Sequence, residues 1–281
     1  MTWLLQIKHT TRFTYGTKAN ASYNEARLTP LTLPSQTTLE SRIEVEPNAT
    51  IYRYHDYWGT QVSAFDLQEA HGQLAVIATS MVETEDPAAR LLPAVDWLVL
   101  RDPATFDRFS ELLAITKRTE VDDDLAEQVA ARVDGMTPSE AASEVAALVH
   151  SEVDYVPGAT GVQTNAHEAW ARRQGVCQDM AHLTVGLLRR LGIPARYVSG
   201  YMHPKPEAEI GVTVKGQSHA WVEWWDGEWV AHDPTNDKSA GVEHVVVGRG
   251  RDYTDVAPLK GVYQGRPATE LAVSVDVTRL G

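Results

Sequence analysis

The spacing of apolar and polar residues divides the chain into a strand-rich first third and a helical middle. Residues 1–15 alternate like a strand, and residues 39–47, 60–67 and 73–83 alternate or run apolar between turn-forming residues. Over residues 102–153 the apolar positions recur with helical spacing. Runs of strands without helices are typical of antiparallel sandwiches or barrels, so we expect a β-domain followed by helices.

Capping residues mark the starts of two helices in the middle of the chain. Thr137 is followed three residues later by Glu140, which is the spacing of a capping box. Asn165 and Glu168 repeat this pattern, and Gly175 is expected to end the second helix. Further strand-like segments cover residues 195–201, 219–225, 228–233, 242–248 and 271–277.

The single cysteine, Cys177, is predicted to lie at the N-terminus of an amphipathic helix that Gly192 and Pro194 bring to an end. At a helix N-terminus the positive end of the helix dipole favours a thiolate, and the unpaired N–H groups can bind an oxyanion. A lone cysteine is also compatible with a buried residue that only fills space, so the thiol needs chemical partners before it indicates catalysis. The apolar face of the helix consists of Met180, Leu183, Leu187, Leu188 and Leu191.

The candidate partners of the thiol are His219 and Asp233, which lie on the two strands of a predicted hairpin. A catalytic thiol needs an imidazole to take its proton, and the imidazole needs a third group to fix its tautomer. A two-residue turn at Asp226 and Gly227 would place His219 opposite Pro234. His219 and Asp233 would then lie on opposite faces, which is incompatible with a triad.

A longer loop in the same hairpin would bring the two side chains together. If residues 225–227 form a three-residue loop with a left-handed glycine, Trp224 pairs with Glu228 and His219 lies directly opposite Asp233. Tryptophans on the same face would then shield the pair from water. We therefore expect this loop, or an equivalent bulge, if His219 and Asp233 act together.

Composition narrows the classes of partner and the cellular location. With 43% hydrophobic and 22% charged residues the chain is typical of a globular protein, and its net charge of −13 opposes binding to nucleic acid or to an anionic membrane. It shows neither a signal peptide nor an apolar run of about 18 residues, so we expect a cytoplasmic protein. One cysteine cannot form an internal disulfide or build a cysteine-based zinc site, and the histidines lack the HExxH spacing. We therefore expect no metal and no cofactor.

Three consecutive motifs resemble those of the bacterial transglutaminase-like proteins, which are members of the papain-like cysteine enzyme superfamily. They are GVCQDMAHLTVGLLRRLGIPARYVSGY at residues 175–201, SHAWVEWW at residues 218–225 and WVAHDPTN at residues 229–236. The segments IKHTTRFTY and SYNEARLTP also resemble the N-terminal β-domain of bacterial members, and GRDYTDVAPLKGVYQG resembles their C-terminal segment.

The resemblance implies an α+β fold in which a papain-like core packs its cysteine helix on an antiparallel sheet. We expect an N-terminal β-sandwich-like domain over residues 1–90 and a helical connector, part of the core domain, over residues 91–155. The catalytic core with the C-terminal strands is expected over residues 156–281.

By the same resemblance, Cys177 is the nucleophile, His219 is the general base and then the acid, and Asp233 orients the imidazole. The N–H of Cys177 is the first candidate oxyanion donor. Further candidates for an oxyanion or supporting role are Gln178, Trp170 and Trp221.

Such a triad implies acyl transfer from an amide through a thioester, with a protein or peptide as the expected substrate. If water accepts the acyl group, the protein is a cysteine protease or amidohydrolase, and if an amine accepts it, the protein is a crosslinking transglutaminase. Hydrolysis is the favoured interpretation because the sequence shows no calcium motif and no extracellular targeting. A protein-binding module that retains these residues without catalysis is a further alternative.

Overall fold

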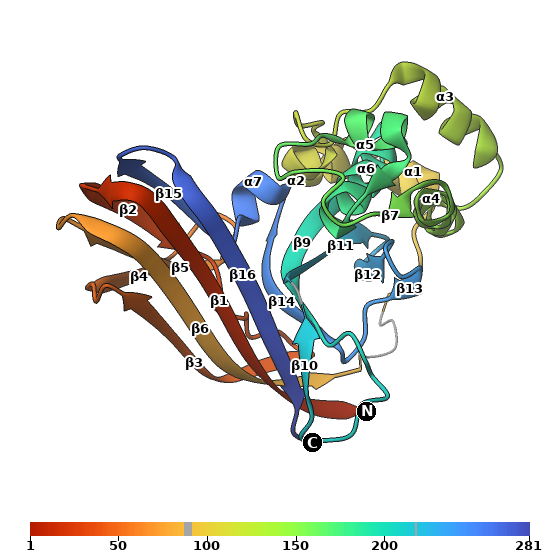
Figure 1. The fold of residues 1–281 in the computed structure, drawn as a ribbon. Coiled ribbons are helices and arrows are strands. Elements are labelled where there is room, and N and C mark those ends of the chain that lie inside the picture. The colour runs from red at the N-terminus through yellow and green to blue at the C-terminus, as the bar shows by residue number, and fades with distance from the viewer. Residues whose placement is uncertain (87–91, 217) are drawn as a thin grey trace.

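The two ends of the chain meet in one sheet of a β-sandwich. A computed structural model describes residues 1–86, 92–216 and 218–281. The first sheet is antiparallel and has the strand order β10-β16-β1-β6-β3 (Figure 1). Its strands are β1 (Thr2–Ala19), β3 (Gln36–Glu46), β6 (His71–Glu85), β10 (Thr213–Gly216) and β16 (Ala268–Arg279).

A second antiparallel sheet, with the order β15-β2-β5-β4, completes the sandwich. Apolar side chains from both sheets, such as Ile43 and Phe65, share one buried cluster. The strands predicted over residues 39–47, 60–67 and 73–83 are confirmed as β3, β5 and β6. The strands of the second sheet are β2 (Ala21–Ala26), β4 (Ile51–His55), β5 (Gln61–Leu67) and β15 (Leu259–Gln264).

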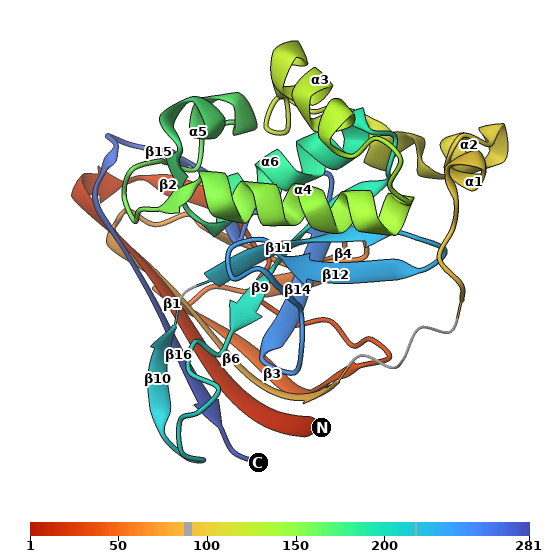
Figure 2. The same ribbon diagram turned by 90° about the vertical axis from the view of Figure 1, so that its right-hand side faces the viewer.

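The C-terminal strands belong to this sandwich and not to the core with which the sequence pattern grouped them. β16 pairs with β1, so that Val277 lies opposite Ile7, and β15 pairs with β2. Alternation along a strand indicates which face is buried but not which strand lies beside it, so the sequence pattern did not reveal this pairing. The two termini consequently lie close together (Figure 1 and Figure 2). The predicted boundary at residue 90 falls outside the described residues.

The core domain is an antiparallel sheet covered by helices, as the expected α+β class requires. The sheet has the order β13-β12-β11-β9-β14, and α6 (Cys177–Arg190) packs on it with every residue from 178 to 189 buried. Figure 2 shows α4 (Pro138–Glu152) lying along the helical side of this sheet. The strands are β9 (Ala195–Met202), β11 (Ser218–Trp225), β12 (Trp229–Asp233), β13 (Lys238–Ser239) and β14 (His244–Gly250).

Both predicted capping patterns are confirmed. Thr137 accepts the N–H of Glu140 at 3.3 Å, and Asn165 accepts the N–H of Glu168 at 2.8 Å. The second helix ends earlier than predicted, because the residue after Arg172 takes a left-handed conformation with φ of 53° and Gly175 lies in a short strand. The remaining elements are α1 (Trp97–Leu100), α2 (Pro103–Leu113), α3 (Asp123–Arg132), α5 (Ala166–Arg172), α7 (Tyr253–Val256), β7 (Asp154–Tyr155) and β8 (Gln174–Gly175).

Among the described residues, none of the helices combines the length and the apolar character that crossing a membrane requires.

Candidate active site

Cys177 is the first residue of α6, as predicted, and it is partly exposed. Asp179 fixes this helix start, because its Oδ2 accepts the N–H of Val176 at 2.8 Å and the hydroxyl of Thr160 at 2.6 Å. A Cβ on Gly175 would lie 2.8 Å from the Cβ of Asp179, so the chain needs a glycine before the helix. These contacts hold the thiol at a well-defined helix N-terminus.

His219 and Asp233 meet behind the thiol. Nε2 of His219, on β11, lies 2.7 Å from Oδ2 of Asp233, the last residue of β12, and both side chains are buried. Cys177 lies close enough to His219 to raise the pKa of its imidazole. Because Asp233 occupies Nε2, the ring nitrogen left for the sulfur is Nδ1. The structure therefore brings together the three residues that the sequence singled out.

The hairpin that carries His219 and Asp233 has a three-residue loop, but the predicted register is wrong by two positions. Trp225 pairs with Trp229, so the loop consists of residues 226–228, and its central glycine has φ of 84°. A shift of two residues leaves every side chain on its original face, because side chains alternate along a strand. His219 and Asp233 therefore still share a face.

The two buried groups stabilise each other's charged forms. Burial alone would lower the pKa of His219, but its hydrogen bond with Asp233 and its interaction with the neighbouring Cys177 outweigh that effect and raise the pKa to about 10. Burial alone would raise the pKa of Asp233, but hydrogen bonds from His219 and His244 hold it well below the usual range. The arrangement favours an imidazolium between a carboxylate and a sulfur.

The three supporting candidates, Trp221, Gln178 and Trp170, differ in their position relative to His219 and Cys177. Trp221 is almost completely buried and stacks on His219, with ring centroids 6.1 Å apart. Gln178 follows Cys177 in the first turn of α6 and is buried. Trp170 packs on the same apolar cluster as Cys177, but within the described residues no ring contact or side-chain hydrogen bond joins it to His219.

Sequence reasoning missed two side chains that bind the buried carboxylate. Nδ2 of Asn236 donates to Oδ2 of Asp233 at 2.6 Å, and Nε2 of His244 lies 3.2 Å from the same oxygen. The N–H of Thr235 donates to Oδ1 at 3.0 Å. Asn236 follows an Asp-Pro turn, a signal that could have indicated a bond back to the aspartate. No local pattern connects His244 with the site.

Three side chains around this carboxylate, His219, Asp233 and His244, have a spacing that could bind a metal ion. The ligand atoms of His219, Asp233 and His244 lie within 4.8 Å of one another, and no other group of His, Cys, Asp and Glu in the described part of the chain has this spacing. All three are buried and hydrogen-bonded to one another through Asp233.

A cavity of about 440 Å³ adjoins His219. Tyr155, on β7, forms part of its wall, and burial together with the neighbouring Cys177 raises the pKa of this tyrosine. Two residues of β10, a strand of the sandwich, also line the cavity, so both halves of the molecule shape it. The lining residues are Tyr155, Met202, Pro204, Lys215, Gly216, Ser218, His219, Thr235 and Asn236.

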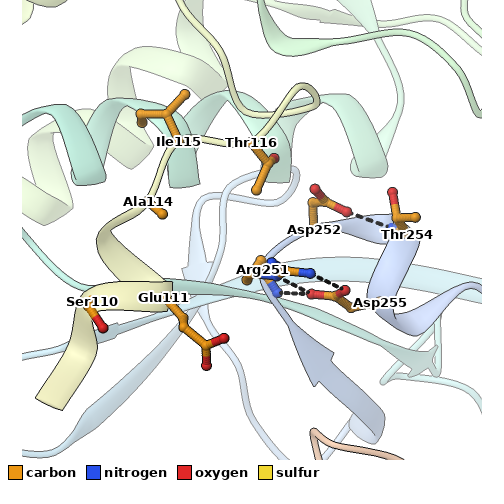
Figure 3. Close-up of a pocket in the computed structure, with 9 residues that line it drawn as sticks. All are labelled: Ser110, Glu111, Ala114, Ile115, Thr116, Arg251, Asp252, Thr254 and Asp255. Carbon is orange, nitrogen blue, oxygen red and sulfur yellow. Dashed lines mark hydrogen bonds and ion pairs between the residues drawn. The ribbon is translucent and has the colours of Figure 1, made fainter.

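A second cavity, of about 580 Å³, lies between α2 and the start of α7 (Figure 3). Its charged groups bind one another: Arg251 pairs with Asp255 at 2.9 Å, and Asp252 accepts the N–H of Thr254 at 2.7 Å. Neither Cys177 nor His219 lines it. The smaller cavity is therefore the one of the two that His219 lines.

Comparisons with known proteins cover both halves of the molecule. Residues 5–83 match the bacterial transglutaminase-like N-terminal region, and residues 124–234 match the transglutaminase-like superfamily. An uncharacterized protein of Mycobacterium leprae is 47% identical over 99% of this chain and 99% of its own length. Another, of Mycobacterium tuberculosis, is 32% identical over 97% of this chain and 91% of its own length.

Two further similarities concern proteins with named activities. A protein-glutamine gamma-glutamyltransferase of Pseudomonas aeruginosa is 33% identical over 121 residues, which are 40% of this chain and 18% of that protein. A crystal structure of a candidate cysteine protease from Cytophaga hutchinsonii shares the fold, with a TM-score of 0.74 and 21% identity over 99% of this chain and 100% of the other. Since full-length relatives match beyond 30% identity and both family regions occur in order, the chain belongs to the transglutaminase-like superfamily, with the bacterial N-terminal region at its start.

Proposed function

We propose that this chain is a thiol enzyme that transfers the acyl group of an amide to water through a thioester on Cys177. The observation that carries the proposal is the position of the His219 imidazole, whose Nε2 lies 2.7 Å from Oδ2 of Asp233 and whose pKa the neighbouring Cys177 raises. A cysteine that only fills space does not require a neighbouring imidazole that is paired with a buried carboxylate. A nucleophile needs a base, and the base needs a group that fixes its tautomer.

The proposed reaction uses His219 twice. The thiolate of Cys177 attacks the amide carbonyl, and the N–H groups at the start of α6 stabilise the oxyanion that forms. His219 donates its Nδ1 proton to the leaving amine as the C–N bond breaks, which leaves a thioester. Water then attacks the thioester while His219 takes its proton, and the carboxylic acid leaves as the C–S bond breaks.

The cavity beside His219 supports a peptide or a protein side chain as the substrate. Its volume of about 440 Å³ fits a small group rather than a folded domain, and its wall combines apolar Met202 and Pro204 with polar Ser218 and Asn236. The cysteine protease name of the fold neighbour agrees with hydrolysis.

The Pseudomonas aeruginosa relative supports a second candidate, amine acceptance. A protein-glutamine gamma-glutamyltransferase uses a glutamine side chain as the acyl donor, and here a primary amine would replace water in the second half of the reaction. The same Cys177, His219 and Asp233 would serve both reactions, so the acceptor has to be determined by product analysis.

The test is the incubation of glutamine-containing peptides with the protein, with and without a primary amine, followed by mass spectrometry. New peptide termini, or glutamate in place of glutamine, that are absent with Cys177→Ala would support hydrolysis, whereas amine adducts would assign the transferase. In parallel, iodoacetamide should label Cys177 faster in the native protein than in His219→Ala. The proposal that the chain is an enzyme would be overturned if no product formed and both proteins were labelled as slowly as a free thiol. This result would favour a protein-binding module.

A further inference from the structure

Asp233 is held by a second imidazole that the proposed reaction does not use. His244 is the first residue of β14, is 5% exposed and lies with its Nε2 3.2 Å from Oδ2 of Asp233. β13 and β14 lie at opposite edges of the core sheet, so the chain between them crosses the end of the sheet. This crossing brings His244 beside Trp221, with the rings edge to face and their centroids 5.2 Å apart.

The hydrogen bonds of His244 determine where its proton lies. Its Nδ1 lies 3.1 Å from the backbone nitrogen of Gly241, and a backbone N–H can only donate. Nδ1 is therefore the acceptor and carries no proton. The proton of the neutral ring lies on Nε2, which faces Asp233, so His244 donates a hydrogen bond to the carboxylate.

The tautomer of His244 indicates whether the three side chains form a metal site or a hydrogen-bonded cluster. His219, Asp233 and His244 have metal-ligand spacing. A metal bound to Nε2 of His244 would require the ring proton on Nδ1, where it would face the N–H of Gly241, donor against donor. The contacts of His244 therefore favour a donor to the carboxylate over a metal ligand.

We propose that His244 is a positioning residue of the Cys177 site, a neutral imidazole that fixes the Asp233 carboxylate so that His219 presents its free nitrogen to the thiol. The inference rests on the proposed function. His244 itself acts only through Asp233. It lies beyond residue 234, where the match to the transglutaminase-like superfamily ends, so the family motif does not assign it a role.

The need for a second donor follows from the burial of Asp233. Its side chain has no exposed surface, so water cannot replace a lost hydrogen bond. Oδ2 accepts from Asn236, His219 and His244, while Oδ1 accepts the N–H of Thr235. Rotation of the carboxylate would carry Oδ2 away from His219. Donors on both oxygens oppose that rotation.

The test compares two substitutions of His244 that differ in the ability to donate a hydrogen bond to Asp233. His244→Phe keeps a ring against Trp221 but has no donor, whereas the amide nitrogen of His244→Gln can still reach Asp233. We expect His244→Phe to lower the rate of Cys177 alkylation by iodoacetamide at pH 7 by about tenfold, and His244→Gln to remain within about threefold of the native rate. His9→Phe is the matched control, because His9 is equally buried but lies in the sandwich, and it should leave the rate unchanged.

A second measurement separates this inference from the proposed function. Nitrogen NMR of the native protein should report His244 with a protonated Nε2 and an unprotonated Nδ1, whether or not Cys177 is reactive. If Cys177 reacts like a free thiol, the proposed function fails while the NMR result still supports the position of His244. A protonated Nδ1, stoichiometric Zn²⁺ binding that is lost in His244→Phe, or equal alkylation rates for a folded His244→Phe and the native protein would each overturn the inference.

Discussion

At the scale of single residues, the ionisation of His219 depends on its two polar neighbours. We expect Cys177→Ala to lower the pKa of His219 from about 10, because burial lowers this pKa and the substitution removes one of the two partners that raise it. Nitrogen NMR of His219 across pH 5 to 11 measures the change. Gln178→Ala, a neutral change in the same helical turn, should not move the titration. An unaltered titration in Cys177→Ala would mean that the sulfur and the imidazole do not interact.

The raised pKa of His219 also predicts how stability depends on pH. The folded-state pKa of about 10 exceeds the ordinary value of 6.5, so the folded protein binds the proton more tightly than the unfolded chain does. This contribution is complete below about pH 6.5 and is lost as the pH rises through about 10. Urea unfolding at pH 7 and pH 10.5 should therefore show a larger loss of stability in the native protein than in His219→Phe. Equal losses would contradict the shift.

Gly175 is predicted to be irreplaceable because of its distance to Asp179. A Cβ at residue 175 would lie 2.8 Å from the Cβ of Asp179, and displacement of that side chain would weaken its bond to the N–H of Val176. We expect Gly175→Ala to cost about 2 kcal/mol in the free energy of unfolding, measured in urea, and to slow Cys177 alkylation. Gly161→Ala is the control, because nothing lies within 4 Å of its Cβ position, and it should change stability by less than about 0.5 kcal/mol. Similar costs for the two substitutions would refute the steric explanation.

Residue types and their order were sufficient to single out Cys177, His219 and Asp233, because thiol chemistry needs a base and an orienting carboxylate. The role of His244 could not be predicted in this way. It depends on a crossing of the chain between β13 and β14, and nothing in the local sequence shows where such a crossing ends.

At the scale of elements, the hairpin loop keeps His219 and Asp233 on one face, and Gly227 makes that loop possible. Gly227 has φ of 84°, and a Cβ there would lie 2.7 Å from the carbonyl oxygen of Pro93. We expect Gly227→Ala to cost about 2–3 kcal/mol in the free energy of unfolding and to slow the alkylation of Cys177. Thermal and urea unfolding together with the alkylation rate measure both effects.

The control for Gly227 separates its two constraints. Gly158 also has a positive φ, 81°, but nothing lies within 4 Å of its Cβ position. Gly158→Ala should therefore show the conformational cost alone, about 1 kcal/mol. If both substitutions cost the same, the contact with Pro93 contributes nothing.

Periodicity predicted most strands and helices correctly, and the capping residues marked two helix starts, because both signals are local. The pairing register of the hairpin strands was harder to predict from the sequence. Trp225 pairs with Trp229 where Trp224 with Glu228 was expected, because the sequence around Asp226 and Gly227 permits three-residue loops at more than one position. The face was predicted correctly, since it depends only on parity.

At the scale of the whole molecule, the sandwich and the core share apolar packing. One buried cluster includes Ile7 and Val277 from the first sandwich sheet together with Tyr201 and Val245 from the core sheet. Interfaces of this kind couple the unfolding of the parts that form them. The two halves are therefore expected to unfold together, even though they match separate family regions along the sequence.

Val277→Ala tests this coupling. Val277 is 1% exposed within the shared cluster, so loss of its two methyl groups should lower the free energy of unfolding by about 2 kcal/mol. Tryptophan fluorescence, which reports mainly on the core, and far-ultraviolet circular dichroism should shift to lower urea together. Val273→Ala, in the same strand but 53% exposed, should shift neither by more than about 0.5 kcal/mol. If the cluster couples the two halves, a substitution in it lowers the stability of both. Two separated transitions in Val277→Ala would therefore show that the sandwich unfolds without the core.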